Sequence, residues 1–170
     1  MATKDNTLKL ARVFGDGMIL QREQPIRVWG WAAPGAEVKI RFLGKQYGTT
    51  VDESGEWIVE MDEASPGGPY EMEIESSGEV RLIQDVLIGD VWICAGQSNM
   101  ELPMGRVDRM FSSEIAEARN SAIRHFRVPD KYNFHEPQSD IAGGSWVAAD
   151  PESVREFSAV GYFFAKALYE

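Results

Sequence analysis

The sequence has little cysteine and histidine and no long hydrophobic run. Its 170 residues include one cysteine, Cys94, and two histidines, His125 and His135. One cysteine excludes an internal disulfide and a cysteine-based metal cluster, and two histidines leave little material for a zinc site. No apolar run approaches the roughly 20 residues of a membrane-spanning helix. We therefore expect a soluble protein without a metal site.

Positive charge is also scarce, because 17 Lys and Arg stand against 27 Asp and Glu, a formal net charge of −10. This balance disfavours binding to nucleic acid and to anionic membrane surfaces. The first seven residues lack the apolar core of a signal peptide. Localisation is therefore left open between the cytoplasm and a secreted or periplasmic form whose signal peptide has been removed.

Residues 1–85 have the pattern of short strands separated by turns. Apolar residues alternate with polar ones, which places each set on one face of a strand. Glycine and proline lie between these runs, as in Pro34-Gly35 and Ser76-Ser-Gly78. The pattern predicts an antiparallel β-sandwich domain. The alternating sets are Val38, Ile40 and Phe42, then Trp57, Val59 and Met61, then Tyr70, Met72 and Ile74.

The pattern changes near residue 86, where residues 86–95 are close to continuously apolar, as in a strand buried on both faces. Helical spacing follows over 107–118, and 123–128 resembles a second strand. A strand, a helix and a strand in this order predict a crossover between two parallel strands. The sequence therefore predicts that 86–170 is the opening part of an α/β domain.

The remainder of this domain is expected to be a polar connection and a helix. Residues 129–152 are long enough to border a site, and Trp146 within them is expected to pack the loop rather than stack on a sugar. Apolar residues at helical spacing predict a helix over 153–169. Two parallel strands and two helices do not complete a doubly wound domain, so we expect this domain to be truncated.

The strongest local motif is Gly96-Gln-Ser98-Asn-Met100, which directly follows the expected buried strand. A serine at the carboxyl end of a parallel strand lies where α/β folds bind their ligands. Gly96 permits a tight turn that projects the Ser98 hydroxyl, and the following N–H groups can point toward an oxyanion. From spacing alone, the simpler interpretation is that Ser98 caps the next helix.

Several segments in order resemble one known family. Residues 89–100, Gly-Asp-Val-Trp-Ile-Cys-Ala-Gly-Gln-Ser-Asn-Met, resemble the nucleophile segment of the sialate O-acetylesterase family of SGNH-type hydrolases. The resemblance spans nearly the whole chain and favours a catalytic Ser98 over a capping one. The other matching segments are 13–22, Val28-Trp-Gly30, Pro34-Gly35, Gly55-Glu-Trp57, Gly67-Gly-Pro-Tyr70 and 157–165.

The resemblance implies a serine hydrolase that removes O-acetyl groups from sialic acid or a related acetylated sugar, without metal or organic cofactor. It implies that Ser98 is the nucleophile and that its N–H stabilises the oxyanion. A second backbone donor is expected near Ser158 and Ala159, although this position lacks the glycine of related hydrolases. Gln97 and Asn99 flank the nucleophile and either contact the sugar or brace the turn.

The histidine base and the oxyanion-hole asparagine of this family lie downstream of Glu170. We therefore do not assign the base to His125, which is expected to pack within a strand, or to His135, which is expected to be a solvated loop residue. Cys94 is expected to be a small buried core residue. Three tryptophans in the first half suggest carbohydrate binding, but Trp57 shares its face with apolar residues and is expected in the core.

Two other functions remain open from the sequence. The chain could be a noncatalytic β-sandwich module for carbohydrate binding or assembly, with a serine that does not react. It could also be one subunit of a split esterase, whose partner is a complementary chain. In the esterase interpretation the partners are an acetylated carbohydrate and the missing C-terminal half.

Overall fold

The structure is a computed structural model that describes residues 7–170. Residues 1–6, within the segment where the sequence lacks a signal-peptide core, lie outside the described residues. The described chain forms two compact units. The first runs to Asp90 and also includes Val128–Gly144, and the second comprises Val91–Arg127 and Ser145–Glu170. Strands predominate in the first unit, and the second mixes strands with short helices, so the fold is of mixed α and β type.

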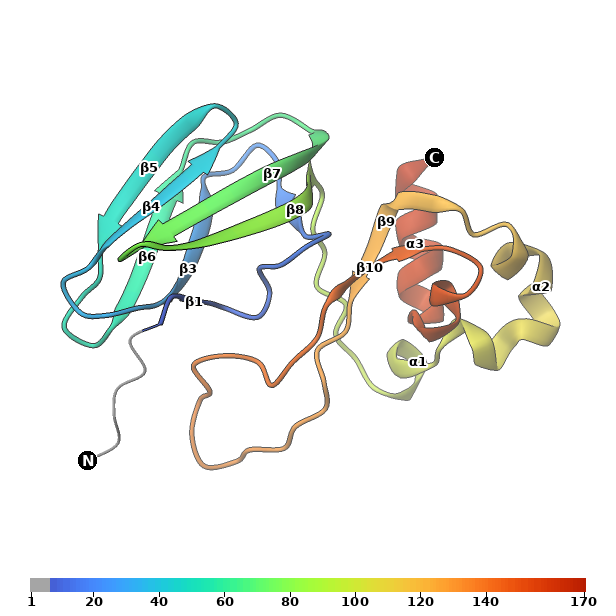
Figure 1. Cartoon of the computed structure of the whole chain (residues 1–170). Coiled ribbons are helices and arrows are strands. Elements are labelled where there is room, and N and C mark those ends of the chain that lie inside the picture. The colour runs from blue at the N-terminus through green and yellow to red at the C-terminus, as the bar shows by residue number, and fades with distance from the viewer. Residues whose placement is uncertain (1–6) are drawn as a thin grey trace. The chain divides into compact units, whose positions relative to one another are not determined.

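The first unit contains two sheets (Figure 1). Strands of the three-stranded sheet follow the order β1-β3-β6, and those of the five-stranded sheet follow β2-β8-β7-β4-β5. The bounds are β1 (Lys9–Leu10), β2 (Ile19–Gln21), β3 (Ile26–Trp31), β4 (Glu37–Phe42), β5 (Lys45–Thr50), β6 (Glu56–Met61), β7 (Gly67–Ser76) and β8 (Glu79–Gly89).

The alternation predicted for the first unit is confirmed by burial. Val38, Ile40 and Phe42 of β4 are buried, as are Met72 and Ile74 of β7. Trp57 of β6 is also buried, as expected for a core residue, together with Val59 and Met61. Period-two patterning therefore fixes which face of each strand packs inward.

Tight turns set the register of two hairpins. Strands β4 and β5 pair from Phe42 to Lys45, which leaves Leu43 and Gly44 in the turn, both with positive φ. Ser77 and Gly78 join β7 to β8 in the same way. Two successive residues with positive φ are typical of a type I′ turn, whose twist matches that of the flanking strands.

One pairing in the first unit is parallel, unlike the antiparallel pairing expected from the sequence. Strand β2 pairs with β8 in parallel, from Ile19 opposite Leu87 to Gln21 opposite Gly89. Parallel neighbours need a long connection, and the intervening chain from β3 to β7 provides it. The predicted domain boundary after residue 85 stays a prediction, while the first compact unit continues to Asp90.

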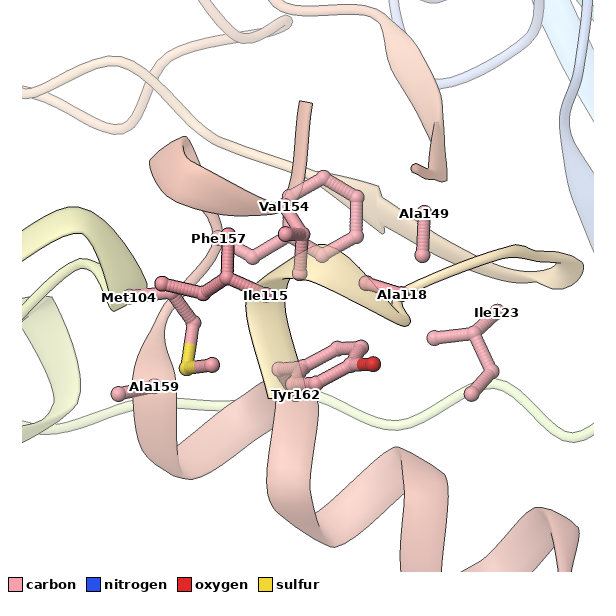
Figure 2. Close-up of a cluster of buried hydrophobic side chains, with 9 residues drawn as sticks. All are labelled: Met104, Ile115, Ala118, Ile123, Ala149, Val154, Phe157, Ala159 and Tyr162. Carbon is pink, nitrogen blue, oxygen red and sulfur yellow. The ribbon is translucent and has the colours of Figure 1, made fainter. Parts of the chain in front are cut away.

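The second unit packs its short elements around one apolar cluster. Figure 2 shows nine side chains converging from helices, strands and loops of this unit. Its elements are α1 (Ser98–Glu101), the 3₁₀ helix η1 (Met104–Val107), α2 (Asp108–Ala116), β9 (Asn120–Phe126), β10 (Trp146–Ala149), the 3₁₀ helix η2 (Ser153–Glu156) and α3 (Ala159–Tyr169). The cluster consists of Met104, Ile115, Ala118, Ile123, Ala149, Val154, Phe157, Ala159 and Tyr162.

The parallel strand pair predicted for the second half is wrong. Residues 86–89 are the end of β8 in the first unit, and residues 90–97 form no strand and are exposed. Strand β9 instead pairs antiparallel with β10, with Trp146 opposite Phe126. An apolar run forms a buried strand only where other strands pair with its edges and packed layers cover its faces, and no described strand pairs with residues 90–97.

The helices of the second unit are shorter than predicted. The helix expected over 107–118 begins as η1 and continues as α2, with non-helical φ and ψ at Phe111. The helix expected over 153–169 is divided into η2 and α3, because Phe157 and Ser158 are extended. Strand β10 arises in the expected polar connection, and the rings of Trp146 and Phe126 pack at 5.5 Å, as predicted for Trp146.

Candidate active site

Ser98 is the first residue of α1 and is exposed. The chain enters this helix from the irregular segment 90–97, so no sheet hydrogen bonds hold the approach to it. The helix itself is closed by backbone bonds, because the Gln97 carbonyl accepts the N–H of Met100 (2.9 Å) and of Glu101 (3.0 Å). The Ser98 carbonyl accepts the N–H of Leu102 (3.0 Å). Backbone bonding thus orders α1 while the Ser98 side chain stays accessible.

The Ser98 side chain does not cap the helix. The cap residue of α1 is Gln97, and no side-chain hydrogen bond caps the helix. The simpler interpretation from spacing, a capping serine, is therefore wrong for this geometry. The Ser98 hydroxyl is therefore exposed and takes no part in capping, and its role as a nucleophile stays a prediction.

Gly96 provides the close turn that precedes Ser98. A Cβ atom at this position would lie 2.9 Å from Met100 Cβ. Because real Cβ atoms essentially never approach so closely, any larger residue would push α1 away. The sequence motif therefore has a steric basis, in which Gly96 lets the helix carrying Ser98 fold back against the preceding chain.

Helix α1 is joined to the start of α3 by backbone and side-chain bonds. The N–H of Ala159 donates to the Leu102 carbonyl (2.9 Å), and the N–H of Met104 donates to the Phe157 carbonyl (2.9 Å). These two bonds flank the bridge between Pro103 and Ser158. The segments expected to form the nucleophile and the oxyanion hole are thus adjacent in space.

This connection argues against one predicted oxyanion donor. The Ala159 N–H is already engaged by the Leu102 carbonyl, so it cannot point toward a developing oxyanion without breaking that bond. The Ser158 hydroxyl accepts the N–H of Gly161 (3.2 Å) and thereby caps α3. Ser158 therefore orders the α3 terminus, and a direct role of its backbone in an oxyanion hole stays a prediction.

The Ser158 side chain also reaches α1. Its hydroxyl donates to the sulfur of Met100 across 3.4 Å. Sequence reasoning included Met100 in the motif but missed its bond to Ser158. Spacing alone gave no signal for it, because the two residues lie on separate elements.

Gln97 and Asn99 flank Ser98 and are exposed. Within residues 7–170 no side-chain hydrogen bond is described for either amide. Their proposed contact with a sugar stays a prediction.

Cys94 is exposed, so the expectation that it is a buried core residue is wrong. The reason is the same as for the strand: residues 90–97 are not covered by a sheet. Its sulfur lies 3.7 Å from the position that a Cβ on Gly161 would occupy. Cys94 therefore lies close to the first turn of α3.

Neither histidine makes a described hydrogen bond to Ser98. His125 lies in β9, and its ring packs 4.8 Å from that of Phe157. Burial, and then the positive charge of Arg127, lower the pKa of His125 below its ordinary value. The packed role expected for His125 agrees with this environment, because a half-buried imidazole beside a cation favours the neutral form.

His135 belongs to the Val128–Gly144 segment of the first unit. It is exposed, and its N–H donates to the side-chain oxygen of Asn133 (3.0 Å). This is the solvated loop position that the sequence predicted.

Two further kinds of feature, a metal site and a membrane-spanning helix, can be checked over residues 7–170. No group of three or more His, Cys, Asp or Glu side chains within 7–170 is placed to hold a metal ion. Over the same residues, no helix has both the length and the apolar character needed to cross a bilayer.

Comparison with known proteins identifies the family. No family model matches the chain. Sialate O-acetylesterase from Mus musculus is 33% identical over 132 residues, which cover 71% of this chain and 24% of that protein. The Homo sapiens sialate O-acetylesterase is 27% identical over 179 residues, covering 95% of this chain and 34% of its own length. The chain thus spans at most about a third of these relatives.

A solved structure agrees with the sequence matches. The crystal structure of a carbohydrate acetylesterase from Xanthomonas citri has a TM-score of 0.90 and 40% sequence identity, over 94% of this chain and 36% of that one. The resemblance predicted from residues 89–100 is therefore confirmed. On this agreement over nearly its whole length, the chain belongs to the sialate O-acetylesterase family.

Proposed function

We propose that this chain contributes the nucleophile to a carbohydrate O-acetylesterase, and that Ser98 is the nucleophile. The observation that carries the proposal is the exposed Ser98 at the start of α1. It follows closely on Gly96, where a Cβ atom would lie 2.9 Å from Met100 Cβ. Relatives and a structural neighbour named as sialate O-acetylesterases and a carbohydrate acetylesterase support the reaction class.

The reaction would be acyl transfer. Ser98 Oγ attacks the acetyl carbonyl, and the carbonyl oxygen takes the negative charge of the tetrahedral intermediate. The Ser98 N–H has no acceptor within α1 because it is the first residue of that helix, so it can donate to this oxygen. Collapse of the intermediate breaks the bond to the sugar oxygen, which leaves with a proton, and water then releases acetate from the serine.

We propose that the base is a histidine outside residues 1–170. Support comes from the environments of the two histidines in this chain. His125 packs on Phe157, and His135 is an exposed loop residue. The reaction therefore requires a further segment or chain to take the proton from Ser98.

We further propose that the two units correspond to an N-terminal β-sandwich and the opening part of an SGNH-type hydrolase domain. Buried residues on both sheets of the first unit support the sandwich, including Val28 and Val59 from one sheet and Ile40 and Ile74 from the other. The placement of Ser98 beside the α3 terminus supports the hydrolase assignment.

A chimaera tests the proposal. These 170 residues would replace the corresponding third of the Xanthomonas citri acetylesterase, with which they share 40% identity. Acetate release from O-acetylated sialic acid or another acetylated sugar is expected from the chimaera and is expected to disappear in Ser98→Ala. Ser112→Ala, which removes an exposed hydroxyl from α2, is the matched control and should retain activity.

Two results would contradict the proposal. Full activity of the Ser98→Ala chimaera would exclude Ser98 as the nucleophile. A folded but inactive wild-type chimaera, measured beside the active parent, would mean that this segment does not carry the chemistry. Acetate release by the 170-residue chain alone would overturn only the assignment of the base.

A further inference from the structure

The outward face of the three-stranded sheet carries an exposed tryptophan. On β3, Val28 points inward and is fully buried, whereas its neighbour Trp29 is 39% exposed. Trp29 pairs with Ile58 of β6, which is 53% exposed on the same face. The sheet therefore presents an apolar patch where a solvated face normally carries polar residues.

The Trp29 indole is held in place by neighbouring groups. Its ring meets that of Phe14 edge to face, with centroids 4.6 Å apart and planes at 84°. Two residues before it along β3, the ion pair of Arg27 and Glu60 (2.8 Å) occupies the same face. An aromatic ring fixed in this way loses little conformational entropy when it binds a ligand.

A cavity of about 260 Å³, widely open to solvent, lies beside this indole. Ala11, Val13 and Trp29 supply an apolar side, and residues 138–141 supply a side with an amide, a hydroxyl and a carboxylate. The volume is below the roughly 300–1,000 Å³ typical of pockets for drug-sized ligands, so it suits a single small ring.

The polar side of the cavity is fixed to the chain beneath it. Both carboxylate oxygens of Asp140 accept the N–H of Arg12, at 3.1 and 3.2 Å. One of them also accepts the N–H of Ile141 (2.8 Å). These bonds hold the 138–141 loop against the residues that precede β2, so the two sides of the cavity keep their spacing.

We propose that this cavity binds an uncharged pyranose ring. One face of a pyranose consists of C–H groups, which pack on an indole, and its edge carries hydroxyls, which both donate and accept hydrogen bonds. The Gln138 amide donates one N–H to the Glu136 carbonyl (3.4 Å) and keeps a second N–H and its oxygen for a ligand. Ser139 offers a hydroxyl, and the Asp140 carboxylate retains lone pairs beyond its backbone bonds. The indole can therefore pack on the C–H face of the sugar ring, while the polar side chains bond to its hydroxyls.

Charge selects a neutral ring over an acidic one. Asp140 lies in the cavity wall, and the chain carries a net charge of −10. A sugar carboxylate would be repelled by both, so sialic acid itself is a poor ligand here. The cavity is lined by residues of the first unit alone, whereas Ser98 belongs to the second.

Binding is tested by NMR titration of the protein with the methyl glycosides of galactose, glucose and N-acetylglucosamine. At least one glycoside is expected to shift the Trp29 indole N–H resonance and the backbone N–H resonances of Arg12 and Ile141 at millimolar concentration, and N-acetylneuraminic acid is expected to bind more weakly. The backbone resonances report binding in the variants that lack the indole. Trp29→Ala should weaken binding about tenfold, because it removes the stacking surface. Trp29→Phe should restore part of the affinity, and Gln138→Ala should weaken it several-fold.

Trp92→Ala is the control, since Trp92 is an exposed tryptophan of the second unit. Its binding should match the wild type, as should that of Ser98→Ala, which separates this site from the esterase proposal. Preserved dispersion of the amide resonances shows that each variant is folded. The proposal is overturned if no glycoside shifts the indole resonance at tens of millimolar, or if folded Trp29→Ala binds as tightly as the wild type.

Discussion

The Ser158 hydroxyl donates to the sulfur of Met100 across 3.4 Å while accepting the N–H of Gly161 at 3.2 Å. One side chain thus caps α3 and contacts α1 two residues beyond Ser98. The backbone bonds of Ala159 and Met104 run beside this contact. The orientation of the proposed nucleophile is therefore coupled to the start of α3.

Removing this hydroxyl should weaken both helices. Ser158→Ala is expected to lower the free energy of unfolding by about 1 kcal/mol, the usual cost of losing an N-cap. In the chimaera it should lower kcat more than it raises KM, because the Met100 contact positions α1 rather than holding the substrate. Urea denaturation and steady-state acetate release measure the two effects. Ser158→Thr keeps the hydroxyl and should recover most of both, and an unchanged kcat in Ser158→Ala would contradict the coupling.

Gly96 should tolerate no side chain. A Cβ there would lie 2.9 Å from Met100 Cβ, so Gly96→Ala is expected to displace α1 and reduce acetate release by the chimaera more than tenfold. Gly15→Ala is the matched control, because a Cβ at Gly15 meets nothing within 4 Å. If both variants retained wild-type turnover, the close turn would not be required for activity.

The strands of the first unit could be predicted because each one shows its buried face in its own sequence. Val38, Ile40 and Phe42 alternate with polar residues, and burial follows that alternation. The parallel partner of β8 could not be predicted, since β2 is three residues long and its pairing depends on a distant strand. The local sequence pattern therefore predicts which face of a strand is buried better than it predicts which strand pairs with it.

The second unit was harder to predict because its elements depend on what surrounds them. The apolar run at 86–95 indicated a buried strand, yet Ile93 is 93% exposed. Strand β10 was missed because it lies in a segment of mostly polar composition. In the site, the sequence motif was enough to locate Gly96 and Ser98. The hydrogen bond from the Ala159 N–H to the Leu102 carbonyl could not be predicted, because it depends on how two distant segments pack together.

His125 should make the stability of the protein depend on pH. Burial, and then the charge of Arg127, lower its pKa in the folded state below the unfolded value of about 6.5. Above that value both states are neutral and His125 contributes no pH dependence. As the pH falls through it, the unfolded state binds the proton first, so the free energy of unfolding decreases until the folded-state pKa is reached.

Urea denaturation at neutral and mildly acidic pH measures this effect. His125→Phe keeps a ring against Phe157 but cannot be protonated, so its loss of stability on acidification should be smaller than that of the wild type. His135→Gln alters an exposed histidine and should follow the wild-type curve. Equal acid sensitivity in the wild type and His125→Phe would show that His125 is not the group responsible.

The exposed apolar side chains of the 90–97 segment should make the chain associate. Val91, Trp92 and Ile93 are 39%, 60% and 93% exposed, and Phe164 of α3, whose ring meets that of Trp92 at 5.2 Å, is 40% exposed. Contiguous apolar surface of this kind is covered in stable proteins, at a gain of roughly 25 cal/mol per Å². Light scattering should therefore show that the apparent mass rises with concentration, and a hydrophobic dye such as ANS should bind.

Ile93→Lys distinguishes this surface from general instability. Because the Ile93 side chain makes little contact within the chain, a lysine there should leave the unfolding midpoint unchanged while reducing self-association and dye binding. Val38→Lys offers the contrast, since Val38 is fully buried in the first unit and a charge there should unfold it. A wild-type chain that stays monomeric at high concentration, with dye binding equal to that of Ile93→Lys, would mean that the 90–97 segment is not an association surface.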